Sequence, residues 1–171
     1  VKSIFFIKKI NKKAQHMKAQ SSAKNISDKD AISLLKKDHR DMGNAFKKFE
    51  KLGEKKIAEK KRLADKIGDD LLKHMAIEEK IFYPTVKKAI KSVEDVVNEG
   101  VVEHAAAKVL IKELKGMKGD EDLFESKMHV LEEQISHHVE EEEKEMFPKV
   151  EKSSIDLEAL GQKLAERKAK L

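Results

Sequence analysis

Apolar residues recur every three or four positions along most of this chain, the spacing that places side chains on one face of an α-helix. Alternating runs rich in Val, Ile, Thr and Tyr, which would predict strands, are absent. Five segments show the helical spacing, and four of them are long and separated by short turns. The pattern therefore predicts an all-α fold, an up-down-up-down antiparallel four-helix bundle followed by a short fifth helix.

Capping and helix-breaking residues suggest where these helices begin and end. The long helices are expected at about residues 28–51, 56–83, 92–115 and 120–148, and the fifth helix from about 153. The expected N-caps of the first, third, fourth and fifth helices are Ser27 or Asp28, Ser92, Asp120, and Ser153 or Ser154. Pro84 is expected to kink or end the second helix, and Pro148 to end the fourth. We expect the fifth helix to pack across one end of the bundle.

The apolar face of each long helix is interrupted by a histidine. The four predicted faces are Ile32, Leu35, His39, Met42, Phe46 and Phe49; Ala64, Ile67, Leu71, His74, Glu78 and Ile81; Val93, Val97, Val101, His104, Ala107, Ile111 and Leu114; and Phe124, Met128, Leu131, Ile135, His138, Glu142 and Met146. A buried carboxylate costs several kcal/mol unless a cation or strong donors compensate it. Two glutamates on these faces therefore need a common explanation.

Two of the faces carry the same motif. His74 is followed four residues later by Glu78, and His138 is followed four residues later by Glu142, with a proline six residues after each glutamate. On a helix this spacing puts both side chains on one face, about 6 Å apart along the axis. Each pair is suited to holding one metal ion.

A single histidine in a core is usually a hydrogen-bonded packing residue. Four such histidines with two glutamates at matched spacing instead indicate a metal site, whose predicted ligands are His39, His74, Glu78, His104, His138 and Glu142. This set suits two ions, one bound by the first two histidines and one by the last two, with both glutamates as bridges. Imidazole and carboxylate ligands favour iron, with manganese and zinc as alternatives.

Composition excludes several other classes. The 171 residues contain no cysteine, which excludes disulfides, zinc ribbons, iron–sulfur ligation and thiol catalysis. No apolar run reaches the roughly 18 to 20 residues of a transmembrane helix. The net charge is +5, but residues 1–27 contain seven lysines and no acid, so the remainder carries −2. A body without a basic face argues against nucleic acid as a partner.

The basic N-terminal segment is expected to lie outside the bundle. We divide the chain into an extension at 1–26 and a helical domain at 27–171. The extension fits a mobile arm, a weak membrane-surface helix, or a leader to an organelle or for export. The cytoplasm is the expected compartment unless the extension is such a leader. The sequence does not indicate an oligomeric state.

The order of these residues resembles the hemerythrin-like HHE cation-binding domain family over about residues 28–170. The resemblance rests on His39, on His74-x-x-x-Glu78 with Phe82-Tyr83-Pro84, on His104, on His138-x-x-x-Glu142 with Phe147-Pro148, and on the segments 34–40 and 157–161. It implies two iron ions in a non-haem centre with carboxylate and oxo or hydroxo bridges, able to bind O2 or react with oxidants. Ferritin-like bundles place glutamate first and histidine three residues later, so this chain is not ferritin-like.

One position departs from the family pattern. Oxygen-carrying hemerythrins have a second histidine four residues after the helix-three ligand, and here that residue is Lys108. Its ammonium either extends into solvent or places a positive charge near the site. His129 and His137 fall off the apolar faces and are expected to face solvent. Glu79 and Glu141 are candidate acceptors for ligand N–H groups, and Tyr83 is a further candidate neighbour of the site.

The function indicated is binding of O2, or sensing or scavenging of an oxidant or of iron, at a dinuclear centre, without turnover. One alternative is a di-iron oxidoreductase that consumes peroxide or nitric oxide. Another is a helical interaction module with a structural metal, whose basic tail binds a membrane or an acidic partner.

Overall fold

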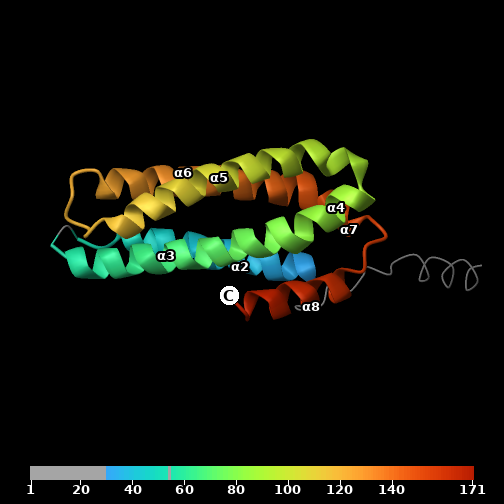
Figure 1. The fold of residues 1–171 in the computed structure, drawn as a ribbon, viewed down its shortest axis with the longest axis horizontal. Helices are drawn as coiled ribbons and strands as arrows, with labels where there is room; N and C mark the ends of the chain where they lie inside the picture. The colour runs from blue at the N-terminus through green and yellow to red at the C-terminus, as the bar shows by residue number, and fades with distance from the viewer. Residues whose placement is uncertain (1–29, 54) are drawn as a thin grey trace, which may run out of the picture.

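The computed structural model describes residues 30–53 and 55–171, and every regular element within them is helical (Figure 1). Four long helices run antiparallel to their neighbours: α2 (Ala31–Glu50), α3 (Ile57–Ile77), α5 (Glu94–Gly116) and α6 (Phe124–Glu141). In Figure 1, α5 and α6 form one layer over α2 and α3. The predicted four-helix bundle is confirmed. The predicted extension at 1–26 lies outside the described residues, so the domain boundary stays a prediction.

The second and fourth helices continue past their prolines instead of ending there. α3 passes into a π-helical turn, η1 (Glu78–Phe82), and then into α4 (Tyr83–Ala89); α6 passes likewise into η3 (Glu142–Met146) and α7 (Phe147–Glu151). A proline has no N–H, and its ring crowds the carbonyl four residues earlier. The wider π-turn relieves this crowding, so the helix can continue past the proline. The predicted end of the fourth helix at Pro148 is therefore wrong.

Each π-turn also changes which residues face the core. In η1 the backbone N–H of Tyr83 donates to the carbonyl of Glu78, five residues earlier. The extra residue rotates the helix, so Phe82 and Tyr83 are buried, while Ile81, predicted on the apolar face, is only half-buried. Helical spacing alone does not reveal this rotation because it assumes an unbroken α-helix.

Aspartates cap two helices, at positions other than those predicted. The carboxylate of Asp30 accepts the backbone N–H of Ser33 at 3.0 Å, and that of Asp156 accepts the N–H of Ala159 at 3.0 Å, which begins α8 (Leu157–Lys168). The predicted caps Ser92 and Asp120 are wrong. α5 follows a 3-10 turn, η2 (Lys91–Val93), and α6 begins after Leu123, neither with a side-chain cap. Ser27 and Asp28 lie outside the described residues.

The core is divided into two apolar clusters along the bundle. The cluster at the proline end includes Leu35, Ile77, Phe82, Val86, Val97, Phe147 and Leu164. The cluster at the other end includes Met42, Phe46, Ile67, Leu71, Ile111, Phe124 and Leu131. The residues on the four faces between these clusters are the histidines and glutamates. The polar layer is therefore bounded by apolar packing on both sides.

The fifth helix, α8, lies lengthwise beside the bundle. It packs on α2, α3 and η1, with Leu160 and Leu164 in the cluster at the proline end (Figure 1). The expected position across the end of the bundle is therefore wrong. The reason is that its apolar residues complete the side of α2 and α3 near the polar layer.

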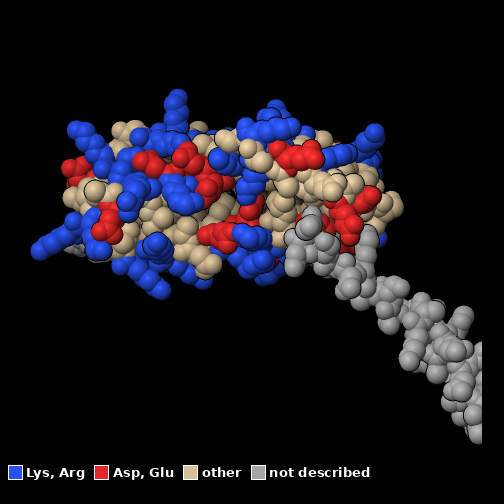
Figure 2. All heavy atoms as spheres, turned by 90° about the horizontal axis from the view of Figure 1, so that it is seen from below, with Lys and Arg blue, Asp and Glu red and all other residues tan. Residues whose placement is uncertain are grey.

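The surface carries both charge signs side by side. On the face drawn in Figure 2, Lys and Arg alternate with Asp and Glu over most of the described part of the molecule. Within the described residues, no helix has both the length and the apolar character that crossing a membrane requires.

Leu131→Ala should lower the free energy of unfolding by about 2 to 5 kcal/mol, because its side chain is 1% exposed and its removal leaves a cavity. The neighbouring Val130→Ala is the matched control, since Val130 is 41% exposed and should change stability by less than about 0.5 kcal/mol. Urea unfolding of both variants measures the difference. Equal losses would contradict the assignment of this face to the core.

Candidate metal centre

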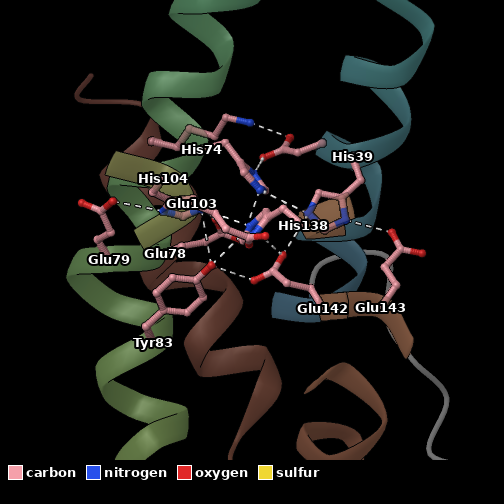
Figure 3. A network of polar contacts seen from close by, with 12 residues as sticks. His39, His74, Glu78, Glu79, Tyr83, Glu103, His104, His138, Glu142 and Glu143 are labelled. Atoms are coloured by element: carbon pink, nitrogen blue, oxygen red, sulfur yellow. Dashed lines mark hydrogen bonds and ion pairs between the residues drawn. The ribbon is translucent and has the colours of Figure 1, made fainter. Parts of the chain in front are cut away.

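All six predicted ligands converge on one buried layer (Figure 3). Each long helix supplies one histidine, and the two glutamates are the first residues of the π-turns η1 and η3. Their exposed fractions lie between 0% for Glu78 and 5% for His39. The layer is therefore shielded from water by the packing described above.

One group of donors lies between α2, α3 and η3. The Nε2 atoms of His39 and His74 are 3.2 Å apart. Glu78 Oε1 lies 3.1 Å from His74 Nε2, and Glu142 Oε2 lies 3.3 Å from His39 Nε2. Donor atoms around one transition-metal ion, each at about 2.0 to 2.2 Å from it, are separated by roughly 3.0 to 3.5 Å. This group is the right size for one cation.

A second group lies on the α5 and α6 side. The Nε2 atoms of His104 and His138 are 3.1 Å apart, and Glu78 Oε2 lies 3.4 Å from His104 Nε2. Glu78 therefore directs one oxygen to each group. Glu142 Oε2 is 3.3 Å from His39 Nε2 but 3.7 Å from His138 Nε2, so it belongs mainly to the first group. The geometry matches Glu78 as a bridge more closely than it matches Glu142.

Each of the four histidines also contacts a carboxylate on its outer side. Nδ1 of each ring faces one carboxylate on a neighbouring helix, in the pairs His39 with Glu143 (2.8 Å), His74 with Asp38 (3.3 Å), His104 with Glu79 (3.0 Å) and His138 with Glu103 (2.7 Å). An ionised carboxylate only accepts, so each Nδ1 carries a proton and donates. Each Nε2 therefore faces the centre, where the neutral ring offers its lone pair.

These contacts form a closed ring around the bundle. The carboxylate on α2 binds the histidine on α3, and the carboxylate after α3 binds the histidine on α5. The carboxylate on α5 binds the histidine on α6, and the carboxylate after α6 binds the histidine on α2. Each ligand is thus oriented by the neighbouring helix.

The oxygens facing the centre lack hydrogen bonds. Glu78 Oε1, Glu78 Oε2 and Glu142 Oε2 are inaccessible and have no hydrogen-bond partner within the described part of the chain. Buried carboxylate oxygens almost always have a donor, because an unpaired one loses its hydration without compensation. Together with the inward lone pairs of the imidazoles, they fit a group that supplies only positive charge. The residues present therefore fit a metal cation.

The electrostatics of the metal-free layer show how strongly it attracts positive charge. Burial lowers the pKa of His74, but the charge of Glu78 and the contact with Asp38 outweigh burial and raise that pKa to about 10. Burial raises the pKa of Glu142, but the contact with His39 and the charge of His138 outweigh it and lower that pKa to about 2. This side of the layer therefore favours a positive charge at His74.

Two lysines extend the ring outward. Lys108 Nζ contacts both oxygens of Glu79, at 2.5 and 2.7 Å, and Lys168 Nζ of α8 lies 2.5 Å from Asp38 Oδ1. Lys108 does not extend freely into solvent. Glu79 lies between this ammonium and His104, because its carboxylate contacts both.

Tyr83 is the remaining polar side chain inside the layer. Its hydroxyl donates to Glu142 Oε1 at 2.9 Å and lies 3.4 Å from the Nε2 atoms of His104 and His138. Gly100 makes room for it, since a Cβ there would lie 3.0 Å from the tyrosine oxygen. The predicted face of the third helix included Val101, which is 45% exposed; Gly100 takes the inward position.

The sequence analysis identified the inner residues but not most of the outer ones. His129 and His137 are exposed as predicted, and Glu79 is an outer acceptor as predicted. Glu141 is not an acceptor for a ligand, and Asp38, Glu103 and Glu143 were missed. Each outer carboxylate is adjacent in sequence to a predicted ligand, but so is Glu141, so adjacency alone does not identify the four.

Comparisons with known proteins identify a cation-binding family and a similar fold. The family model described as the hemerythrin HHE cation-binding domain matches residues 30–150. A crystal structure of a hemerythrin HHE cation-binding domain-containing protein from Mycobacterium kansasii is similar, with a TM-score of 0.69 and 23% sequence identity. The match covers 82% of this chain and 86% of that one. No curated protein matches the sequence.

Metal binding at about pH 8 should release at least one proton per chain, because the pKa of His74 in the metal-free protein is raised to about 10 and the cation displaces its proton. Affinity should then fall as the pH falls, since protons compete for the same nitrogen. Calorimetric titrations in two buffers with different ionisation enthalpies measure the release. A binding enthalpy that does not depend on the buffer would contradict it.

Proposed function

Because the chain belongs to the hemerythrin HHE cation-binding domain family, we propose that it holds two iron ions in this layer and binds O2 or another small oxidant there. One observation carries the proposal. Two groups of inward-facing donors share Glu78, and among the described residues the side chains nearest its two oxygens are imidazoles of these same groups. This arrangement supports a dinuclear centre more directly than it supports a single ion.

The number of inward donors supports two ions. Two ionised glutamates face the centre, and the four histidines are oriented as neutral ligands by their outer carboxylates. A single dication would leave the donors of one group, around 3.1 Å apart, facing each other without a cation between them. With two dications every inward donor has a partner.

The donor set favours iron. The ligands are imidazoles and carboxylates with no sulfur, and this set together with free coordination positions is typical of non-haem iron that reacts with oxygen. Manganese and zinc accept the same donors and remain the alternatives. Iron supplies reversible redox chemistry in this setting, which zinc does not.

The second donor group leaves more of its coordination sphere free. It consists of His104, His138 and one oxygen of Glu78, whereas the first group has four residues. Lys108 occupies the position where oxygen carriers of the family have a fifth histidine, and its ammonium binds Glu79 instead. A small ligand is therefore expected on the α5 and α6 side, next to the hydroxyl of Tyr83.

Burial limits the size of that ligand. The six inner residues are at most 5% exposed, and apolar clusters lie on both sides of them. A molecule entering the layer must pass between packed side chains, which favours O2, peroxide, nitric oxide or azide over any larger substrate.

Tyr83 supports a redox alternative. Its hydroxyl is held beside the second group by Glu142, and burial with the charges of Glu78 and Glu142 raises its pKa well above the ordinary value. A neutral phenol there can donate a hydrogen bond or a proton to a bound oxidant. This placement fits a di-iron oxidoreductase that consumes peroxide or nitric oxide, which we rank below binding without turnover.

His74→Ala should lower bound iron from about two ions per chain to one or fewer, because it removes a ligand of the first group and frees the buried charge of Glu78. His129→Ala is the matched control, since His129 lies on the surface of α6, 65% exposed, and should leave the iron content unchanged. Elemental analysis after iron loading and gel filtration measures both. Wild-type protein without iron after loading would contradict the proposal.

Tyr83→Phe should weaken binding of azide to the iron-loaded protein by about fivefold, the loss of one hydrogen bond of roughly 1 kcal/mol, with the iron content retained. The absorption of the loaded protein in the near ultraviolet and visible, titrated with azide, is the measurement. An unchanged titration would place the ligand away from Tyr83.

Turnover separates the binding function from the enzyme alternative. Catalytic consumption of peroxide or nitric oxide that His74→Ala abolishes would support the oxidoreductase. A stoichiometric reaction without turnover would support a binding or sensing role.

A further inference from the structure

A third histidine and glutamate pair lies on the outer surface of α6. His137 and Glu141 repeat the four-residue spacing of the two inner pairs, one position earlier in the chain than His138 and Glu142. This shift turns them outward, so the His137 side chain is 62% exposed and that of Glu141 is 24% exposed. None of the inner contacts uses them.

A carboxylate from the neighbouring helix joins this pair. Glu141 Oε1 lies 3.5 Å from His137 Nε2, and Glu103 Oε1 of α5 lies 3.9 Å from the same nitrogen. Ligand atoms of the three residues all lie within 4.8 Å of one another. Three donors around one ion at about 2.1 Å would be separated by roughly 3.4 Å in a tetrahedral site. Small side-chain rotations bring this surface cluster to that spacing.

The surface around the cluster is acidic in a lysine-rich protein. Glu99 and Glu145 lie close enough to repel the Glu141 carboxylate, as Glu103 does. Within the described residues, the ion pairs of Glu103 and Glu141 are with histidines alone. Other acids on these two helices differ, since Glu113 of α5 pairs with Lys127 and Glu140 of α6 pairs with Lys144. Among the described residues, no lysine therefore neutralises the carboxylates of this cluster.

A further oxygen without a partner lies beside the cluster. Gln134, one turn before His137 on α6, has an inaccessible Oε1 without a hydrogen bond. The Gln134 residue lines a surface groove of about 410 Å³ together with Glu103 and His137. The groove leaves space beside His137 for the water molecules that would complete a coordination sphere.

We propose that His137, Glu141 and Glu103 form a separate surface site for one divalent transition-metal cation of the zinc class. One imidazole and two carboxylates are suitable ligands for such an ion, and water fills the remaining positions. The site is partly exposed, so it binds more weakly than the buried layer and exchanges its ion more readily. It does not depend on which metal or small molecule the inner layer binds.

Glu103 connects the surface site to the inner layer. Its Oε1 faces His137, while its Oε2 accepts the Nδ1–H of the inner ligand His138 at 2.7 Å. One carboxylate thus serves a surface cation and a buried ligand at the same time. For this reason the variants below leave Glu103 in place.

Zn²⁺ titration of the metal-free full-length chain tests the proposal, with equilibrium dialysis and calorimetry counting bound ions. Wild-type protein is expected to bind one Zn²⁺ more than His137→Ala, and Glu141→Gln is expected to weaken that additional site at least tenfold. His129→Ala is the matched control. His129 forms an exposed pair with Glu133 on the same helix, 3.4 Å apart, and belongs to no three-residue cluster within the described residues.

The result is read from the difference between variants, so it holds whether or not Zn²⁺ enters the inner layer. A His137→Ala variant with wild-type stoichiometry and affinity would overturn the proposal. An equal loss in His129→Ala would overturn it as well, because any exposed pair on α6 would then bind Zn²⁺. Wild-type protein that holds no iron after iron loading, but still binds one Zn²⁺ more than His137→Ala, would refute the proposed function alone.

Discussion

Mutual repulsion among buried donors is the constraint on which this structure depends. Imidazole nitrogens as close as 3.1 Å direct lone pairs toward each other, and carboxylate oxygens without a hydrogen bond lie beside them. In a layer this dry such an arrangement is unfavourable unless positive charge enters it. The charge of Glu78 and the contact with Asp38 accordingly raise the pKa of His74 to about 10, which favours positive charge there. Cation binding and bundle stability are therefore linked.

The outer carboxylates fix the orientation of the four inner histidines. Each one orients a histidine on the neighbouring helix, and the four contacts close a ring through all four helices. A ligand that is hydrogen-bonded on its outer side has its ring orientation and its tautomer determined before the metal arrives. Lys108 and Lys168 in turn hold two of these carboxylates, which links the fifth helix to the centre.

The π-turns determine where the buried glutamates point. Both begin at a glutamate, and both precede a proline whose ring an α-helix would not accommodate. By widening the helix at that point, the first turn brings Tyr83 to the second donor group while Glu78 remains between the two groups. Backbone irregularity and chemistry thus occur at the same residues, because both follow from the same short motif.

The sequence by itself determined the bundle and the six inner residues. Helical spacing identifies His39 and Glu78 as core positions. The same four-residue spacing of histidine and glutamate on two helices indicates that these polar core residues share one role. Only the tertiary structure decided that Glu78, more than Glu142, spans both groups, that Gly100 instead of Val101 faces inward beside Tyr83, and that outer carboxylates come from neighbouring helices. The physical reason is that spacing along one helix reports which face a residue occupies. Distances between helices, and rotations introduced by a π-turn, arise only when the faces pack together.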